Sequence, residues 1–116
     1  MGDQLTDTIC SKLGQLLPQQ SNVIIVSADI PNFTQSDLQA AMLRLQQRAE
    51  GNNSNFWERY GFRDRADFFR YYQRLSEVLV RGSQVRESGL IAWVNSQAKY
   101  PLAGKVRTAL YHSHTV

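Results

Sequence analysis

Apolar residues recur at a spacing of three to four positions in two stretches of the first half of the chain. In residues 4–17 this spacing predicts a helix, and in residues 35–49 it predicts a second one. Thr34 stands just before the second stretch and Asp37 three residues later, which is typical of a capped helix N-terminus. Between the helices, the β-branched run of residues 22–30 predicts a strand. The first half therefore reads helix, strand, helix.

Aromatic residues crowd the start of the second half, around one glycine. The simplest interpretation of residues 56–60 is a short helical turn that Gly61 ends. Asp64 then stands where a third helix needs its N-terminal cap, and Asp67 completes the capping pattern. The expected core-facing side of this third helix consists of Phe68, Tyr72, Leu75 and Leu79.

The hydrophobic period changes from helical to alternating near residue 75. Residues 77–81 and 89–95 each read as a strand, and the polar segment between them is short. Two such strands predict a β-hairpin, with Arg86 at or near its tip. After a break at a proline, residues 102–112 predict a last helix. Its expected apolar positions are Leu102, Val106, Ala109 and Leu110.

The predicted order of elements is helix, strand, helix, helix, strand, strand, helix. Its first six elements have the order of a winged helix, an α+β fold in which the third helix enters a nucleic-acid groove and the hairpin forms the wing. We therefore expect one winged-helix-like domain over residues 1–116. The helix over residues 102–112 would be an extra C-terminal extension.

Composition places the chain among globular proteins. It has 116 residues, 42% of them hydrophobic and 20% charged, enough for one modest core without disulfides or metals. Cys10 is the single cysteine, which excludes an internal disulfide framework. The N-terminus is polar and acidic, unlike a signal peptide, and apolar runs such as residues 23–26 are too short for a membrane span. We therefore expect a cytoplasmic protein that does not enter membranes.

Positive charge is modest overall but concentrated in the middle of the chain. The formal net charge is +3. Residues 44–86 contain nine arginines and five acidic residues, which leaves four uncompensated positive charges there. Arginine suits planar, bidentate contacts with phosphate and carboxylate groups. The distribution permits an anionic partner without requiring one.

Two short patterns flank the third predicted helix: Phe56-x-x-x-Tyr60-Gly61-Phe62 before it and Val78-x-Val80-Arg81 after it. Together with the order of elements over roughly residues 5–95, they resemble the LOTUS family of winged-helix domains, also called OST-HTH. The resemblance implies RNA binding. It also implies a second possibility, docking onto a DEAD-box RNA helicase through an added C-terminal helix, the role that residues 102–112 would take.

A basic and aromatic surface on the third helix and the hairpin is the candidate functional site. Arginines on such a surface contact phosphate groups, and a neighbouring tyrosine can stack on a base. We therefore expect a nucleic-acid-binding module, for RNA more than DNA because the resemblance implies RNA. The expected contact residues are Arg63, Arg65, Arg70, Tyr71, Arg74, Arg81 and Arg86.

Two other interpretations of the same surface stay open. Arginine and tyrosine also dominate the hot spots of protein interfaces, so the surface could instead dock a protein partner or a second copy of the chain. Alternatively, the arginines serve only to pair with neighbouring acids. The expected pairs are Asp67 with Arg70, and Glu77 with Arg74 or Arg81.

The sequence lacks the motifs of an enzyme. It contains no P-loop, nucleophile elbow, GxGxxG or CxxC pattern. His112 and His114 are close in sequence, but no cysteine or cluster of acids accompanies them, as a zinc site would need. We expect no catalytic residue, no metal and no cofactor.

Overall fold

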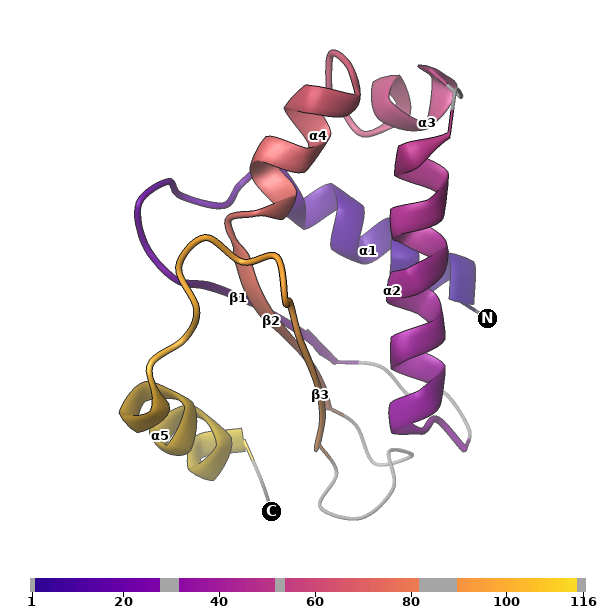
Figure 1. Ribbon diagram of the computed structural model, residues 1–116. Helices are drawn as coiled ribbons and strands as arrows, with labels where there is room; N and C mark the ends of the chain where they lie inside the picture. Colours follow the sequence, from indigo (N-terminus) through magenta and orange to yellow (C-terminus); the bar gives the residue numbers. More distant parts are fainter. Residues whose placement is uncertain (1, 28–31, 52–53, 82–89, 115–116) are drawn as a thin grey trace.

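The structure, a computed structural model, describes residues 2–27, 32–51, 54–81 and 90–114. Within these residues the chain forms five helices and one three-stranded sheet (Figure 1). The α+β class expected from the sequence is thereby confirmed. In chain order the elements are α1 (Gly2–Leu13), β1 (Asn22–Ser27), α2 (Gln35–Glu50), α3 (Ser54–Arg59), α4 (Arg65–Tyr72), β2 (Leu75–Arg81), β3 (Leu90–Val94) and α5 (Gly104–His114).

The sheet is mixed, with the order β1-β2-β3 and β2 at its centre. β1 pairs with β2 in parallel, so α2, α3 and α4 together form the crossover between two adjacent strands. β2 pairs with β3 in antiparallel fashion, which confirms the pairing of the hairpin strands. Arg86, expected at the hairpin tip, belongs to residues 82–89 and lies outside the described residues.

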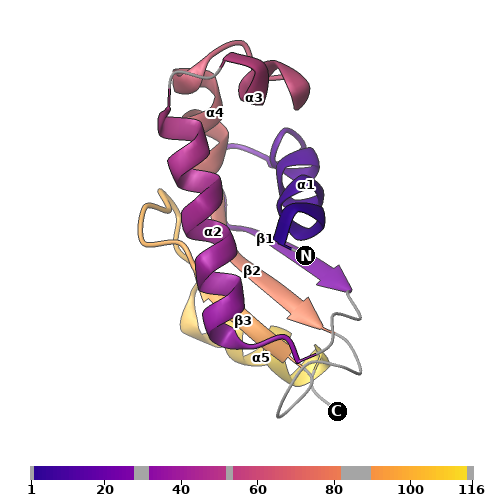
Figure 2. The same ribbon diagram turned by 90° about the vertical axis from the view of Figure 1, so that its right-hand side faces the viewer.

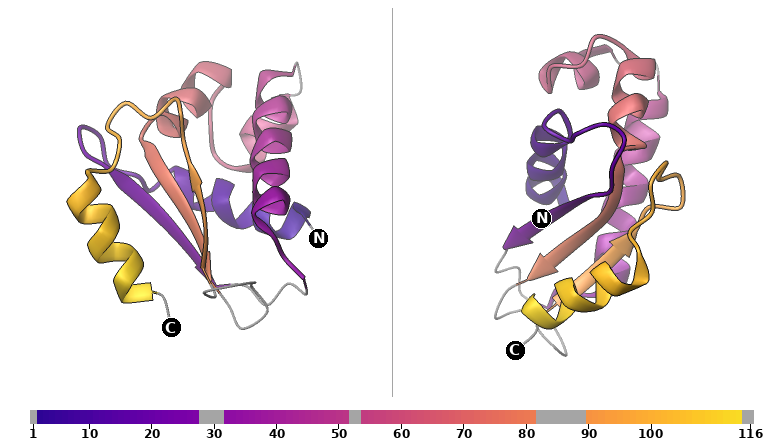
Figure 3. Two further views of the ribbon diagram at one scale, coloured as in Figure 1. Left: turned by 60° about the horizontal axis from the view of Figure 1, so that its bottom comes forward. Right: turned by 90° about the vertical axis from the view of Figure 1, so that its left-hand side faces the viewer.

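Helices lie over both faces of the sheet. α1 and α2 cover one face (Figure 2), and α5 lies over the other (Figure 3). Because side chains alternate along a strand, Ile24, Val78 and Ile91 point together to the side of α1 and α2 and join the main core there. The helices contribute a matching apolar stripe to this core, formed by Leu5, Ile9 and Leu13 of α1 and by Leu38, Met42 and Leu45 of α2.

A strap, residues 95–101, joins β3 to α5 and passes the N-terminal end of β2. Asn95 anchors it, because its buried side-chain amide donates hydrogen bonds to the carbonyls of Tyr72 and Leu75 at 3.0 and 2.8 Å. The hydroxyl of Ser76 donates to a carbonyl near the other end of the strap at 2.7 Å. The strap therefore fixes the point from which α5 starts.

Two helices end earlier than the apolar spacing predicts. α1 ends at Leu13 and not near residue 17, since a glycine with low helix propensity follows directly. α4 ends at Tyr72 and not near residue 75, so Leu75 and Leu79, expected on the core face of this helix, belong to β2. The cause is tertiary structure, because these residues pair in parallel with β1 and so belong to the sheet.

The side of α5 that faces the sheet also differs from the prediction. Val106, expected on the apolar face, is 52% exposed, whereas Arg107 is half-buried and ion-paired to β2. An acid on the sheet therefore decides the rotation of the helix, and apolar spacing does not. The described elements follow the predicted order, with the predicted helical turn before Gly61 present as a separate short helix, α3. The winged-helix topology stays a prediction. No helix in the described ranges is long and apolar enough to cross a membrane.

Candidate nucleic-acid interface

α4 is positioned by a glycine turn that ends α3. The N–H of Gly61 donates to the carbonyl of Glu58 at 3.1 Å, and the N–H of Phe62 donates to the carbonyl of Trp57 at 2.9 Å. These two bonds form a Schellman motif, which favours a residue of positive φ at the turn. Gly61 has a φ of 84°. The predicted end of the helical turn is thereby confirmed, and the chain turns Phe62 into the core.

Two aspartates hold the first turn of α4. Asp64 is the N-cap, and its carboxylate accepts the N–H of Asp67 at 2.8 Å, as the sequence predicted. The Asp67 carboxylate in turn accepts the N–H of Arg63 at 3.1 Å. Negative charge at this end of a helix also interacts favourably with the helix dipole. The start of α4 is therefore fixed by its own side chains.

The Asp67 carboxylate also forms ion pairs with two arginines. Its Oδ1 lies 2.5 Å from Nη2 of Arg70 and 3.7 Å from Nη2 of Arg63. The Asp67 side chain is only 10% exposed, whereas those of Arg70 and Arg63 are 52% and 76% exposed. The backbone hydrogen bond from Arg63, followed by the two guanidinium charges, holds the pKa of Asp67 below its usual value. Two solvent-facing guanidinium groups therefore share one carboxylate that is ionised at neutral pH.

Arg65 turns back toward the C-terminal end of α2. Its Nη2 donates to the carbonyl of Gly51 at 3.3 Å, and its Cζ lies 5.8 Å from the ring centroid of Trp57. The Trp57 ring itself is buried and donates to the carbonyl of Ala49 at 3.2 Å. Arg65 thus links α4 to the segment between α2 and α3.

Arg74 and Tyr71 form a stack at the other end of α4. The Arg74 Cζ lies 4.4 Å from the Tyr71 ring centroid, and its Nη1 donates to the carbonyl of Leu16 at 3.0 Å. The Tyr71 ring is half-buried and lies 5.6 Å from that of Phe62. Arg74 therefore ties the start of β2 to the segment after α1, and its guanidinium covers one face of Tyr71.

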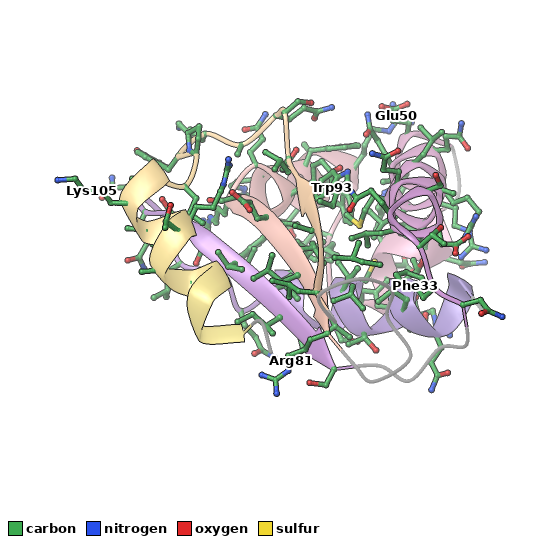
Figure 4. The ribbon with its side chains drawn as sticks, turned by 90° about the horizontal axis from the view of Figure 1, so that it is seen from below. Phe33, Glu50, Arg81, Trp93 and Lys105 are labelled. Atoms are coloured by element: carbon green, nitrogen blue, oxygen red, sulfur yellow. The ribbon has the colours of Figure 1, made fainter. Side chains whose placement is uncertain are left out.

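Arg81 lies apart from α4, at the far end of β2 (Figure 4). β2 has seven residues, so at 3.3 Å per residue its ends are about 20 Å apart. Arg81 and the arginines of α4 therefore do not form one continuous patch. Of the predicted contact residues, Arg63 and Arg70 are the two whose exposed guanidinium groups the structure brings together on one carboxylate.

The local charge around α4 is smaller than the sequence suggests. Residues 63–70 hold three arginines and two aspartates, which leaves one positive charge. However, a guanidinium group that is already held by an ion pair keeps outward N–H donors and loses less conformational entropy when it meets a phosphate. The arrangement suits contacts to phosphate groups, which position a nucleic acid, better than the reading of base edges.

A polar cluster between α1 and α3 was missed by the sequence analysis. The hydroxyl of Tyr60 donates to Asp7, and the other carboxylate oxygen of Asp7 lies 3.5 Å from Nη2 of Arg59. Burial and the hydrogen bond to Asp7 raise the pKa of Tyr60 to about 12. Cys10, one turn further along α1, is fully buried, and this burial raises the pKa of its thiol to about 12. The thiol is therefore unreactive in the folded protein.

Glu77 has an ion-pair partner that the sequence analysis did not identify. Its Oε2 lies 2.8 Å from Nε and 2.5 Å from Nη2 of Arg107 on α5. The sequence suggested Arg74 or Arg81 instead, and Arg74 in fact donates to a carbonyl after α1. A separation of 30 residues hides the Glu77–Arg107 pair from any local pattern. The other expected pair, Asp67 with Arg70, is confirmed.

Other kinds of site receive no support from the described part of the chain. No group of three or more histidine, cysteine, aspartate or glutamate side chains in these residues is arranged to hold a metal ion. Every buried side-chain nitrogen or oxygen in them has a hydrogen-bond partner.

No protein-family model, curated protein or solved structure matches this chain.

Proposed function

We propose that this chain is a non-enzymatic nucleic-acid-binding module of the winged-helix type, which prefers RNA to DNA. The observation that carries the proposal is the Arg63–Asp67–Arg70 cluster, in which one nearly buried carboxylate presents two exposed guanidinium groups. α4 also comes directly before the hairpin strands, the place in the chain of the groove-facing helix of a winged helix.

Binding would proceed through the phosphate backbone. Arg63 and Arg70 each offer N–H donors on the solvent side while Asp67 fixes their position. Contacts of this kind release counterions, so affinity falls as salt rises. The slope of log affinity against log salt concentration is about 0.7 in magnitude per phosphate for a single strand. Two such contacts predict a contribution of about 1.4 to the slope of log affinity against log salt.

Docking of a protein partner is the second candidate function, and one observation favours it. The stack of Arg74 on Tyr71 covers one face of the ring that base stacking would use. If the surface binds without stacking, the exposed Arg63 and Arg70 would serve an acidic protein segment as well as a phosphate backbone. The two candidates therefore differ in the ligand and share the same arginines.

Fluorescence anisotropy with labelled single-stranded RNA, hairpin RNA and duplex DNA, over a series of salt concentrations, tests the proposal. The double variant Arg63→Gln with Arg70→Gln should weaken RNA binding at low salt and reduce the salt slope by about 1.4. Lys12→Gln with Arg44→Gln is the matched control, because both residues are exposed, lie on α1 and α2, and carry the same total charge. The control should leave the slope nearly unchanged.

Three outcomes would contradict the proposal. These are the absence of RNA binding at low salt, an equal loss in the two double variants, and tighter binding of duplex DNA than of RNA. An equal loss would mean that only the net charge of the protein matters. If Arg63→Gln with Arg70→Gln abolishes binding of an acidic peptide and leaves RNA binding unchanged, the docking function replaces the nucleic-acid function.

A further inference from the structure

The outer face of the sheet, on the side of α5, has an acid buried at its centre. The strand register places nine residues on this face: Val23, Ile25, Ser27, Glu77, Leu79, Arg81, Leu90, Ala92 and Val94. Glu77 and Leu79 are 0% exposed, although Leu79 is not part of the main core cluster, so their cover comes from the outer side. Val94 at the margin is 52% exposed. The face is therefore apolar around the carboxylate of Glu77, covered at its centre and partly open at its edge, and it carries Arg81 at the end of β2.

Among the side chains of α5 that the structure describes, residues 104–110, Arg107 makes the main contact with this face. The guanidinium of Arg107 contacts Oε2 of Glu77 through both Nε and Nη2, and its side chain remains 40% exposed. Leu110, one turn further on, is half-buried, whereas Val106 is 52% exposed. Figure 4 shows Lys105 pointing away from the sheet. Within residues 104–110, the side of α5 that faces the sheet is therefore narrow.

The buried acid selects what can lie on the outer face. An ionised carboxylate within an apolar strand is costly unless a cation pairs with it, and a well-packed apolar residue would stabilise such a site as well or better. Glu77 thus favours a covering helix that brings a cation to its carboxylate. A guanidinium fits best, since it contacts the carboxylate through two N–H groups at once, as Arg107 does.

The contacts that fix the chain before α5 do not involve α5 itself. The strap before it is held by the buried Asn95 and by the hydroxyl of Ser76, both independent of α5. Only residues 102–103 separate the end of the strap from the helix. Rotation at this junction would lift α5 while the strap and the sheet stay in place.

We infer that the outer face is a docking site for an arginine-bearing amphipathic helix of a partner protein, and that α5 occupies this site until the partner displaces it. The charge complementarity of Glu77 and Arg107 defines the partner: an arginine with an apolar residue three positions later, as in the pair Arg107 and Leu110. Displacement would uncover Leu79 and join it to the exposed Val94 in one apolar strip around the acid.

A labelled peptide of residues 102–114 serves as the probe, because it carries the helix that the face already accepts. The hosts are three full-length chains: the wild type, Arg107→Gln and Glu77→Gln. The Arg107→Gln host should bind the peptide at least tenfold more tightly than the wild type, since its own helix no longer supplies the guanidinium. A peptide with Arg107→Gln should bind this host at least tenfold more weakly. The Glu77→Gln host, which keeps the shape of the side chain, should not distinguish the two peptides.

Circular dichroism first establishes that each host is folded, and Arg107→Lys replaces Arg107→Gln if the latter is not. Lysine keeps the charge but loses the two-pronged contact, so the preference for the arginine peptide should persist. Equal affinity for both peptides, or no peptide binding to the Arg107-substituted host, would overturn the inference. A dimer of the wild type that light scattering detects and that Arg107→Gln abolishes would also overturn it, because the occupant would then be α5 of a second copy.

Discussion

Gly61→Ala should lower the free energy of unfolding by about 1–2 kcal/mol, the cost of a left-handed backbone conformation for a residue with a Cβ. The structure isolates this cost. Gly61 has a φ of 84°, and a Cβ added there would meet no atom within 4 Å. No side chain has to move, so the whole penalty is conformational. For a domain of this size it corresponds to a fall in Tm of about 4–10 °C.

Urea unfolding followed by tryptophan fluorescence measures the effect, and two further variants control it. Gly14→Ala is the matched control, because its added Cβ also meets nothing within 4 Å while its φ is not positive. It should be neutral or stabilising by up to about 1 kcal/mol. The free energy of unfolding of Gly61→Asn should lie between those of Gly61→Ala and Gly14→Ala, since asparagine tolerates the left-handed region better than alanine. Equal losses for Gly61→Ala and Gly14→Ala, or an asparagine variant as unstable as the alanine one, would refute the reasoning.

Three further predictions concern the acid of α4, the buried thiol and the strap. The pKa of Asp67 is lowered in the folded state, so its stabilisation is present above the unfolded pKa, about 4, and is lost as pH falls through the folded value. The gap in urea midpoint between wild type and Asp67→Asn should accordingly be widest at neutral pH and close in acid; a gap independent of pH would contradict this. Cys10, with a pKa of about 12 and no exposure, should react with a thiol reagent only when the protein unfolds, and rapid labelling of the folded protein would disprove its burial. Asn95→Ala leaves two backbone carbonyls without their donor and should cost about 2 kcal/mol in thermal or urea unfolding, whereas a loss within error would mean that water replaces the amide.

The parts of the fold that were predictable from the sequence depend on chemistry within a few residues. Thr34 and Asp37 exchange hydrogen bonds at 2.9 and 3.3 Å, as their spacing indicated. Gly61 ends α3, and Asp64 caps α4. Each of these features is a contact between neighbours in the chain, so the residue types at the right spacing suffice to predict it.

The parts that could not be predicted depend on contacts between distant residues. The parallel pairing of β1 with β2 sets the end of α4, and the change of hydrophobic period near residue 75 indicated a strand without placing that end. The roles of Arg74 and Arg107 follow from single partners far along the chain, a carbonyl after α1 and the carboxylate of Glu77. Composition thus showed where arginines are abundant, but tertiary structure decides which of them are committed to the fold and which face solvent.

The parallel pairing of β1 with β2 also has a consequence for the rate at which this protein folds. Val23 pairs with Glu77, 54 positions later in the chain (77 − 23), and closing such a loop costs about 3.5 kcal/mol of entropy before any strand contact forms. The helices of the crossover must therefore collapse first and shorten the effective loop. We expect folding slower than that of a helical domain of equal length, with β2 joining β1 in the last steps. Until then its apolar stretch is open to other chains, which makes the interval before sheet closure the stage most exposed to aggregation.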